Sequence, residues 1–274
     1  MPAQVMGVLN VTPDSFSDGG QFLDHAAAIE HGLRLFDEGA DVVDVGGEST
    51  RPGSMPVDAS VEQERVLPVI AALSRRGRVS VDTRNRSTAE AAISAGASMV
   101  NDVGATLWPL CAEAGVAWVA THVQGDPRTM QDAPTYADVV AEVRAFLLDR
   151  AHAALAGGVD EVWIDPGLGF GKTLAHNLAL VAHLDEFVAT GLPVCLGASR
   201  KGFVGRLLAA SDAHGSALPG FAPVPNDSTD PVAVDDRIEG SLAVATWAAI
   251  QGVRMVRVHD VRVSVHACAL VGAR

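Results

Sequence analysis

The 274-residue sequence contains only three cysteines, a single tyrosine and 5% aromatic residues in total. Cys111, Cys195 and Cys268 lie in separate apolar segments with no CxxC spacing, a pattern typical of reduced thiols in a core rather than of disulfides or a metal site. The chain lacks a basic segment followed by an apolar one at its start, and no apolar run is long enough to span a bilayer. We therefore expect a cytoplasmic protein with no membrane partner.

Positive charge is also scarce, because 20 Lys and Arg residues face 33 Asp and Glu residues, which gives a formal net charge of −13. This balance argues against a nucleic-acid partner, although a local cluster of cations can still bind a small anion. The sequence has no HExxH, no GxSxG and no Cys/His array, and "DPGLGFGK" at 165–172 lacks the GxxxxGK[ST] spacing of a phosphate-binding loop. Zinc hydrolysis, serine acyl transfer and nucleotide triphosphate hydrolysis therefore have no motif.

What the sequence does have is a repeated β-α pattern. Eight short runs of Val, Ile, Leu and Met are each followed by an Ala/Leu-rich amphipathic segment, at 5–11, 41–47, 78–83, 98–103, 117–123, 161–167, 193–199 and 255–261. Near-continuous apolar strands indicate burial on both faces, so eight such units favour an α/β fold of the (β/α)8 TIM barrel class. We expect one domain, 1–274, with a short helix at 202–208 and a long loop at about 210–236.

Polar side chains collect where the predicted strands end, which in a barrel of this kind is where the chemistry takes place. These residues are Asn10, Glu48, Ser49, Thr50, Arg51, Asp82, Asn101, Asp102, His122, Gln124, Asp165, Ser199, Arg200, Lys201, Arg257 and His259. Any one of them fits a helix cap or a turn, but eight coincident clusters favour a site at one end of the barrel. Acids and an amide in the middle strands, with cations on the last two, indicate a ligand with a heterocyclic end and a phosphate end.

Eight of these segments, in the same order, resemble the dihydropteroate synthase family. They are "GVLNVTPDSFSDGG", "DVVDVGGESTRPG", "SVDT", "VNDV", "HVQGDPRTMQ", "DPGLGFGKT", "GASRKGFVG" and "VRVHDV", and the resemblance covers nearly the whole chain. It implies a transferase of folate biosynthesis that condenses 6-hydroxymethyl-7,8-dihydropterin diphosphate with 4-aminobenzoate to give 7,8-dihydropteroate and diphosphate. It also implies a homodimer formed through the last helices, and a target of sulfonamides.

The resemblance assigns roles to individual residues. Asp82, Asn101, Asp165 and Lys201 are the predicted catalytic residues that hold the pterin ring, and Asn10 matches the Mg2+ position. The predicted pterin diphosphate site is Asn10, Thr50, Arg51, Asp82, Asn101, Asp165, Lys201, Arg257 and His259. The predicted 4-aminobenzoate site is Phe16, Thr50, Pro52, Ser199 and Lys201.

Two segments depart from the family pattern. The sequence "NDVGATLWP" lacks the Ser-Gly-Gly that usually follows Asn101, and Thr121 stands where the family usually has Met, which exchanges an apolar contact for a hydroxyl. A pterin-binding paralogue with weak or no turnover therefore stays open, as does a pterin-dependent methyltransferase domain. For Lys172, a structural ion pair is nearly as consistent with its position as a role in the site.

Overall fold

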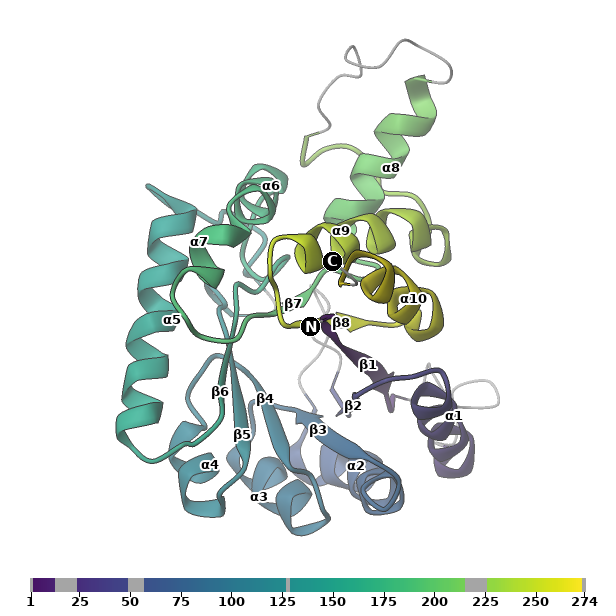
Figure 1. Cartoon of the computed structure of the whole chain (residues 1–274), viewed down its shortest axis with the longest axis vertical. Coiled ribbons are helices and arrows are strands. Elements are labelled where there is room, and N and C mark those ends of the chain that lie inside the picture. Colours follow the sequence, from purple (N-terminus) through teal and green to yellow (C-terminus); the bar gives the residue numbers. More distant parts are fainter. Residues whose placement is uncertain (1, 13–23, 49–56, 127–128, 215–225, 273–274) are drawn as a thin grey trace.

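The computed structural model describes residues 2–12, 24–48, 57–126, 129–214 and 226–272. Its strands are β1 (Gln4–Asn10), β2 (Val42–Gly46), β3 (Arg78–Asp82), β4 (Met99–Val103), β5 (Ala117–Thr121), β6 (Val162–Asp165), β7 (Cys195–Gly197) and β8 (Met255–Val258). They form one parallel sheet in the order β6, β5, β4, β3, β2, β1, β8, β7, and a bridge between Ile164 and Val194 joins its two ends (Figure 1). The predicted (β/α)8 barrel is confirmed.

Helices cover the outside of the barrel. They are α1 (His25–Asp37), α2 (Ala59–Leu73), α3 (Arg86–Ser94), α4 (Trp108–Ala114), α5 (Val139–Ala156), α6 (Leu174–Ala182), α7 (Leu184–Val188), α8 (Gly202–His214), α9 (Ile238–Ile250) and α10 (Val261–Gly272). One large apolar cluster fills the space between these helices and the strands, because every second strand residue faces outward onto it. In the described part of the chain, no helix is long and apolar enough to cross a membrane.

Two predicted segments differ in detail from the structure. The amphipathic segment 173–191, which follows the sixth predicted strand, has the pattern of a single helix. In the structure it is broken into α6 and α7 at His183, whose backbone (φ −113°, ψ 34°) leaves the helical region. The short helix expected at 202–208 is longer, so residues 210–214 are helical where the sequence indicated a loop. Near the end of the same segment, Val234–Asp236 forms a 3-10 helix.

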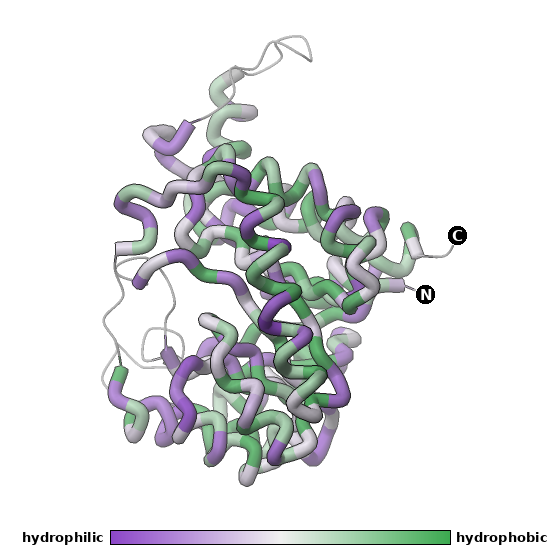
Figure 2. The backbone as a smooth tube through the Cα atoms, turned by 90° about the vertical axis from the view of Figure 1, so that its left-hand side faces the viewer, coloured by the Kyte–Doolittle hydropathy of each residue, from purple (hydrophilic) through white to green (hydrophobic). Residues whose placement is uncertain are grey.

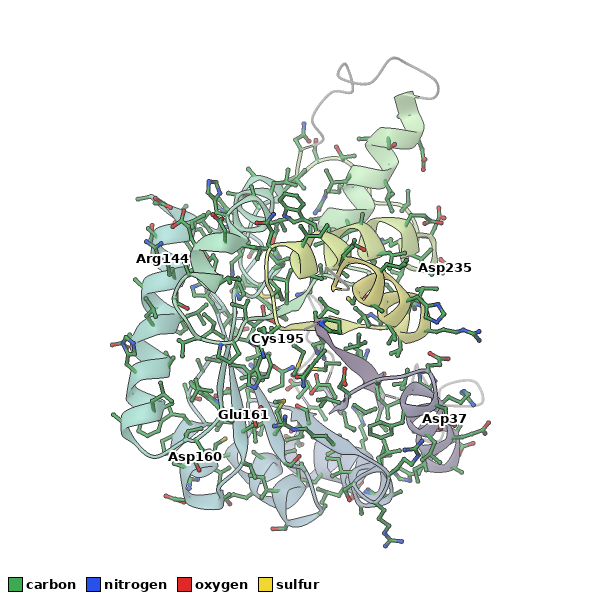
Figure 3. The ribbon with its side chains drawn as sticks, in the orientation of Figure 1. Asp37, Arg144, Asp160, Glu161, Cys195 and Asp235 are labelled. Carbon is green, nitrogen blue, oxygen red and sulfur yellow. The ribbon has the colours of Figure 1, made fainter. Side chains whose placement is uncertain are left out.

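A second, smaller apolar cluster lies inside the barrel. It consists of Met6, Val42, Met99, Ala117, Val119, Trp163, Cys195 and Met255, and Figure 3 shows the labelled Cys195 close to where β7 and β8 meet. Side chains two residues apart on a strand point the same way, so the next inward positions are polar ones. Asp44, Asn101, Asp165 and Arg257 follow Val42, Met99, Trp163 and Met255 in this manner. The barrel thus has an apolar base and a polar layer at the carboxyl ends of its strands.

The two ends of the described chain meet beside the barrel. A Cβ placed on Gly272 at the end of α10 would lie 2.6 Å from the Cα of Pro2, and Figure 2 shows the marked ends close together. The same view shows hydrophobic colour concentrated inside the molecule and hydrophilic colour on its outer turns. The last helix therefore closes the structure against the segment that leads into β1.

Candidate active site

A network of hydrogen bonds joins five strands inside the barrel. We call its members, Asp44, Asp82, Asn101, Thr121 and Arg257, the interior polar network. Arg257 on β8 donates from Nε to Asp44 Oδ2 at 2.6 Å and from Nη2 to Asp82 Oδ2 at 2.7 Å. Asn101 on β4 donates from Nδ2 to Asp44 Oδ2 at 2.9 Å. Thr121 on β5 donates from its hydroxyl to Asn101 Oδ1 at 3.3 Å.

Burial gives this network unusual electrostatics. Burial raises the pKa of Asp82 to about 7, and the nearby guanidinium of Arg257 opposes that rise while the charge of Asp44 adds to it. Although burial disfavours the charge of Arg257, the carboxylates of Asp44 and Asp82 raise its pKa above the ordinary value. One permanent cation is therefore held between two acids, and Asp82 is able to exchange a proton near neutral pH.

Asp165 and Lys201 lie on the other side of the same interior. Asp165, at the end of β6, accepts a hydrogen bond from the backbone N–H of Gly167 at 2.7 Å. A Cβ on Gly197 would lie 3.8 Å from both Asp165 Oδ2 and the Arg257 side chain, so the glycine keeps the space between them open. Burial raises the pKa of Asp165 and lowers that of Lys201 to about 8, and each charge opposes the shift of the other.

Lys201 is held by the glycine-rich loop after β6. Its Nζ donates to the carbonyl oxygen of Leu168 and lies 4.4 Å from the centroid of the Phe170 ring, a cation-π contact. Gly169 has a left-handed backbone (φ +81°), and a Cβ there would approach the Lys201 side chain to 3.4 Å. The loop therefore holds the ammonium group through one carbonyl oxygen and one aromatic ring. The absence of a Cβ at Gly169 leaves room for the aliphatic part of the lysine side chain.

Lys172 fastens the same loop to the end of β5. Its Nζ lies 2.9 Å from Nδ1 of His122 and donates to the carbonyl oxygens of Gly167 and Phe170 at 3.0 Å each. Burial lowers the pKa of Lys172 to about 7, and it lowers that of His122 to about 3. The side chain thus contacts neutral acceptors directly, rather than the carboxylate of the ion pair that we considered from the sequence.

The remaining described residues of the predicted site lie at the rim of the same end. A Cβ on Gly46 would be 3.7 Å from Asn10 Oδ1 and 3.8 Å from Asp82 Oδ2, which places these two oxygens around one glycine. His259 and Ser199 contact each other, since the Ser199 hydroxyl lies 3.1 Å from the His259 backbone N and 3.0 Å from its Nδ1. The contact of Ser199 with His259 connects the rim residues that follow β7 and β8, and Gly46 on β2 lies between the rim residues of β1 and β3.

The structure therefore places every predicted site residue that it describes at one end of the barrel. Asn10, Asp82 and Asp165 are the last residues of their strands, and Asn101 and Arg257 lie within β4 and β8. Ser199, Lys201 and His259 follow their strands. Phe16, Thr50, Arg51 and Pro52 lie outside the described residues.

One polar residue expected at this end faces elsewhere. Asp102 follows Asn101 on β4 and so points to the outer face, where its Oδ2 accepts from the backbone N–H of Thr106 and Leu107, both at 2.6 Å, and from Trp118 Nε1 at 3.1 Å. Its role is structural, because it caps the turn that leads into α4.

Asp44 is the interior residue that the sequence reasoning missed. It lies in the middle of the apolar run of β2, is fully buried, and accepts hydrogen bonds from Arg257 and Asn101. An acid between valines in a strand buried on both faces was the available signal, because such a group requires a charged or hydrogen-bonding partner.

Comparison with known proteins agrees with this arrangement. Residues 6–259 match the pterin binding enzyme family. The dihydropteroate synthase of Mycobacterium leprae is 49% identical over 281 residues, covering 99% of this chain and 93% of that protein. Among solved structures, Xanthomonas albilineans dihydropteroate synthase with 4-aminobenzoic acid has a TM-score of 0.84 at 42% identity, covering 99% of this chain and 93% of that one. Yersinia pestis dihydropteroate synthase with a sulfonamide drug also has a TM-score of 0.84, at 38% identity, covering 99% and 94%.

The family match runs from within β1 to just past β8 and includes every described strand end that carries the polar cluster, which makes the protein a pterin-binding barrel enzyme. At this identity over nearly its full length, the chain belongs to the dihydropteroate synthases. These are enzymes of folate biosynthesis that transfer an alkyl group other than methyl.

Proposed function

We propose that the chain condenses 6-hydroxymethyl-7,8-dihydropterin diphosphate with 4-aminobenzoate, giving 7,8-dihydropteroate and diphosphate. The observation that carries this proposal is the division of the interior into acceptors, which are the buried Asn101 and Asp165 and the partly buried Asp82, and the cations Lys201 and Arg257 beside them. A pterin presents paired N–H donors next to a carbonyl, and its diphosphate presents negative charge, so both ends of the substrate find complementary groups.

The pterin ring is held by the three acceptors. A carboxylate such as that of Asp165 accepts two parallel N–H groups in one plane, which fixes both the position and the rotation of the ring. Asp165 Oδ1 is already fixed by the N–H of Gly167, and Oδ2 lies against the space that Gly197 leaves open. Lys201, supported by Leu168 and Phe170, contacts the ring from the end of β7.

The diphosphate lies at the rim, where we place Mg2+ on Asn10. The described residues contain no group of three or more His, Cys, Asp or Glu side chains that could hold a metal by themselves. Mg2+ prefers oxygen ligands, keeps several waters and is commonly completed by substrate phosphate, so the amide oxygen of Asn10, which faces Gly46 as Asp82 Oδ2 does, fits it. When bound, the ion neutralises charge on the departing diphosphate.

The reaction breaks the C–O bond between the pterin methylene carbon and the diphosphate, and the amine nitrogen of 4-aminobenzoate forms the new C–N bond and releases a proton to water. The carboxylates of Asp82 and Asp165 stabilise positive charge that develops on the ring. His259 and Arg257, with Arg51, stabilise the leaving group. Ser199 and Lys201, with Phe16, Thr50 and Pro52, hold 4-aminobenzoate in line with the carbon.

The test is formation of dihydropteroate from the pterin diphosphate, with and without 4-aminobenzoate and Mg2+. We expect product only with all components present, and loss of about 100-fold or more in kcat/KM for Asp165→Asn, whose charge and acceptor pattern change. Asp160→Asn is the matched control, because this exposed acid lies at the amino end of β6, away from the site (Figure 3).

Pterin binding without product would identify a paralogue, and Mg2+-independent methyl transfer would identify a methyltransferase. Sulfonamides are expected to compete with 4-aminobenzoate.

We further propose a cytoplasmic homodimer that pairs through α9 and α10. These helices pack on each other and expose Trp247 and Ile250 on α9, with Val263 and Leu270 on α10. Leu270 is 80% exposed, which leaves most of its apolar surface in water in the single chain. Sedimentation at micromolar concentration should show a dimer, and Ile250→Asp with Leu270→Asp should give a folded monomer. A wild-type monomer under these conditions would remove the dimer proposal.

A further inference from the structure

The amide group of Asn101 is held from both ends by residues that have no assigned role in the reaction. At one end, Nδ2 donates to Asp44 Oδ2 at 2.9 Å, and at the other end Oδ1 accepts from the Thr121 hydroxyl at 3.3 Å. Asp44 is fully buried and Thr121 is 2% exposed, so water competes little with either bond. Thr121 lies on β5, which is directly next to β4, the strand of Asn101. Asp44 lies on β2, on the other side of β4 and separated from it by β3.

The chemistry of these partners fixes which way the amide points. An ionised carboxylate only accepts hydrogen bonds, so the NH2 end of Asn101 must face Asp44. Rotation of the amide by 180° would place its oxygen against the carboxylate oxygen and leave the Thr121 hydroxyl facing two N–H donors. After both bonds are made, Asn101 has one N–H and one oxygen lone pair left to offer, and their order in space is set.

Asp44 is itself fixed by charge. Its Oδ2 also accepts from Arg257 Nε at 2.6 Å, and Arg257 is tied in turn to Asp82 at 2.7 Å. The ion pair with Arg257 compensates the buried charge of Asp44, and a carboxylate only accepts hydrogen bonds, which is the property that orients Asn101.

We propose that Asp44 and Thr121 are positioning residues for pterin recognition, which hold the Asn101 amide in the single orientation that matches the donor and acceptor order of the ring. This inference rests on the proposed contact of Asn101 with the pterin. It also gives Thr121 a function in this chain. Where the family usually has Met, Thr121 lacks the apolar contact but donates the hydrogen bond that orients the Asn101 amide. Neither positioning residue needs to touch the substrate.

The experiment measures binding of 6-hydroxymethyl-7,8-dihydropterin diphosphate by calorimetry, together with KM and kcat. Thr121→Val keeps the shape of the side chain and removes the hydroxyl, so we expect about three- to tenfold weaker binding, the net worth of one neutral hydrogen bond. The KM for the pterin should rise while kcat stays close to the wild-type value, because the loss is the same in ground and transition states. Thr121→Ser retains the hydroxyl and should bind within about twofold of the wild type.

Asp44→Asn provides the second arm, because it puts an NH2 group where two donors now point. We expect about 100-fold weaker pterin binding, since a charge-assisted contact is lost and the amide is free to rotate. The orientation is also visible directly by NMR: the Asn101 side-chain amide signal, identified by its disappearance in Asn101→Asp, should exchange slowly with water in the wild type and rapidly in Asp44→Asn. If Asp44→Asn does not fold, the Thr121 pair decides the question alone.

The possible failures are distinguishable. Pterin affinity in Thr121→Val equal to wild type, or equally weak binding in Thr121→Ser and Thr121→Val, would overturn the positioning role. Asn101→Leu with unchanged pterin affinity would instead overturn the proposed contact of Asn101, and the inference with it. Loss of binding in Asn101→Leu, weaker binding in Thr121→Val and recovery in Thr121→Ser would support both.

Discussion

Because of Lys172, the free energy of unfolding should rise as the pH increases above 7, and Lys172→Met should remove this contribution. The side chain is 3% exposed, and burial lowers its pKa to about 7 in the folded chain from the ordinary value of 10.5. The unfolded chain therefore binds more protons than the folded chain at every pH between these two values. Below pH 7 the buried charge of Lys172 lowers the free energy of unfolding by its full amount, and this loss is relieved as the pH rises from 7 towards 10.5.

The size of the effect follows from proton linkage. Each proton that only the unfolded state binds changes the free energy of unfolding by about 1.4 kcal/mol per pH unit. At pH 7 the folded Lys172 is about half protonated, and by pH 9 it is almost fully neutral, so the unfolded state binds between half and one additional proton over this interval. Wild-type stability should therefore gain about 2 kcal/mol from Lys172 between pH 7 and pH 9.

The assay is urea denaturation of both proteins at pH 7, 8 and 9, with protein concentration held constant. Lys201, whose pKa is about 8, titrates in the same interval, so the wild-type slope by itself does not isolate Lys172. The difference between the two proteins does, because Lys201 is present in both. Parallel pH profiles for wild type and Lys172→Met would refute the argument that the buried amine is neutral above pH 7.

Two further predictions concern local geometry, and thermal or urea denaturation checks both. Gly167→Ala should destabilise the protein by about 3 kcal/mol or more and reduce pterin binding, because its Cβ would lie 1.9 Å from a carbonyl oxygen at a backbone angle of φ +67°. Gly191→Ala, at φ +81° with nothing within 4 Å, should cost only about 1 kcal/mol, and equal costs would contradict the collision argument. Trp118→Phe should cost about 1–3 kcal/mol beyond the change in packing, since it removes a donor from the buried carboxylate of Asp102. Trp163→Phe, whose indole donates to the half-exposed Glu161, is its control and should cost less.

The apolar runs were enough to predict all eight strands, with differences of at most three residues at either end of each. They sufficed because a strand buried on both faces must be apolar nearly throughout, and little else in a chain of this length has that pattern. The positions of Asn10, Asp82 and Asp165 at strand ends followed from the same runs, since in a barrel of parallel strands these ends share one side.

The sequence was less informative about the long segment before α9, where the helix continued to His214 instead of ending near 208. Its composition indicated turns throughout, but a helix end depends on which side chains find a surface to pack on. The break between α6 and α7 has the same origin, because local propensity at 173–191 contains no signal for it.

Sequence by itself therefore determined the class of fold, the end of the barrel that carries the chemistry and most of the described polar residues there. Only the tertiary structure decided which way each buried strand acid faces: Asp44 on β2 points into the barrel, and Asp102 on β4 points out of it. Asp44 meets Arg257, which lies 213 residues later in the chain, only because closure of the sheet brings β1, β2 and β8 side by side. Local pattern reports that a residue is buried, whereas the partner that makes a buried charge tolerable is supplied by closure of the barrel.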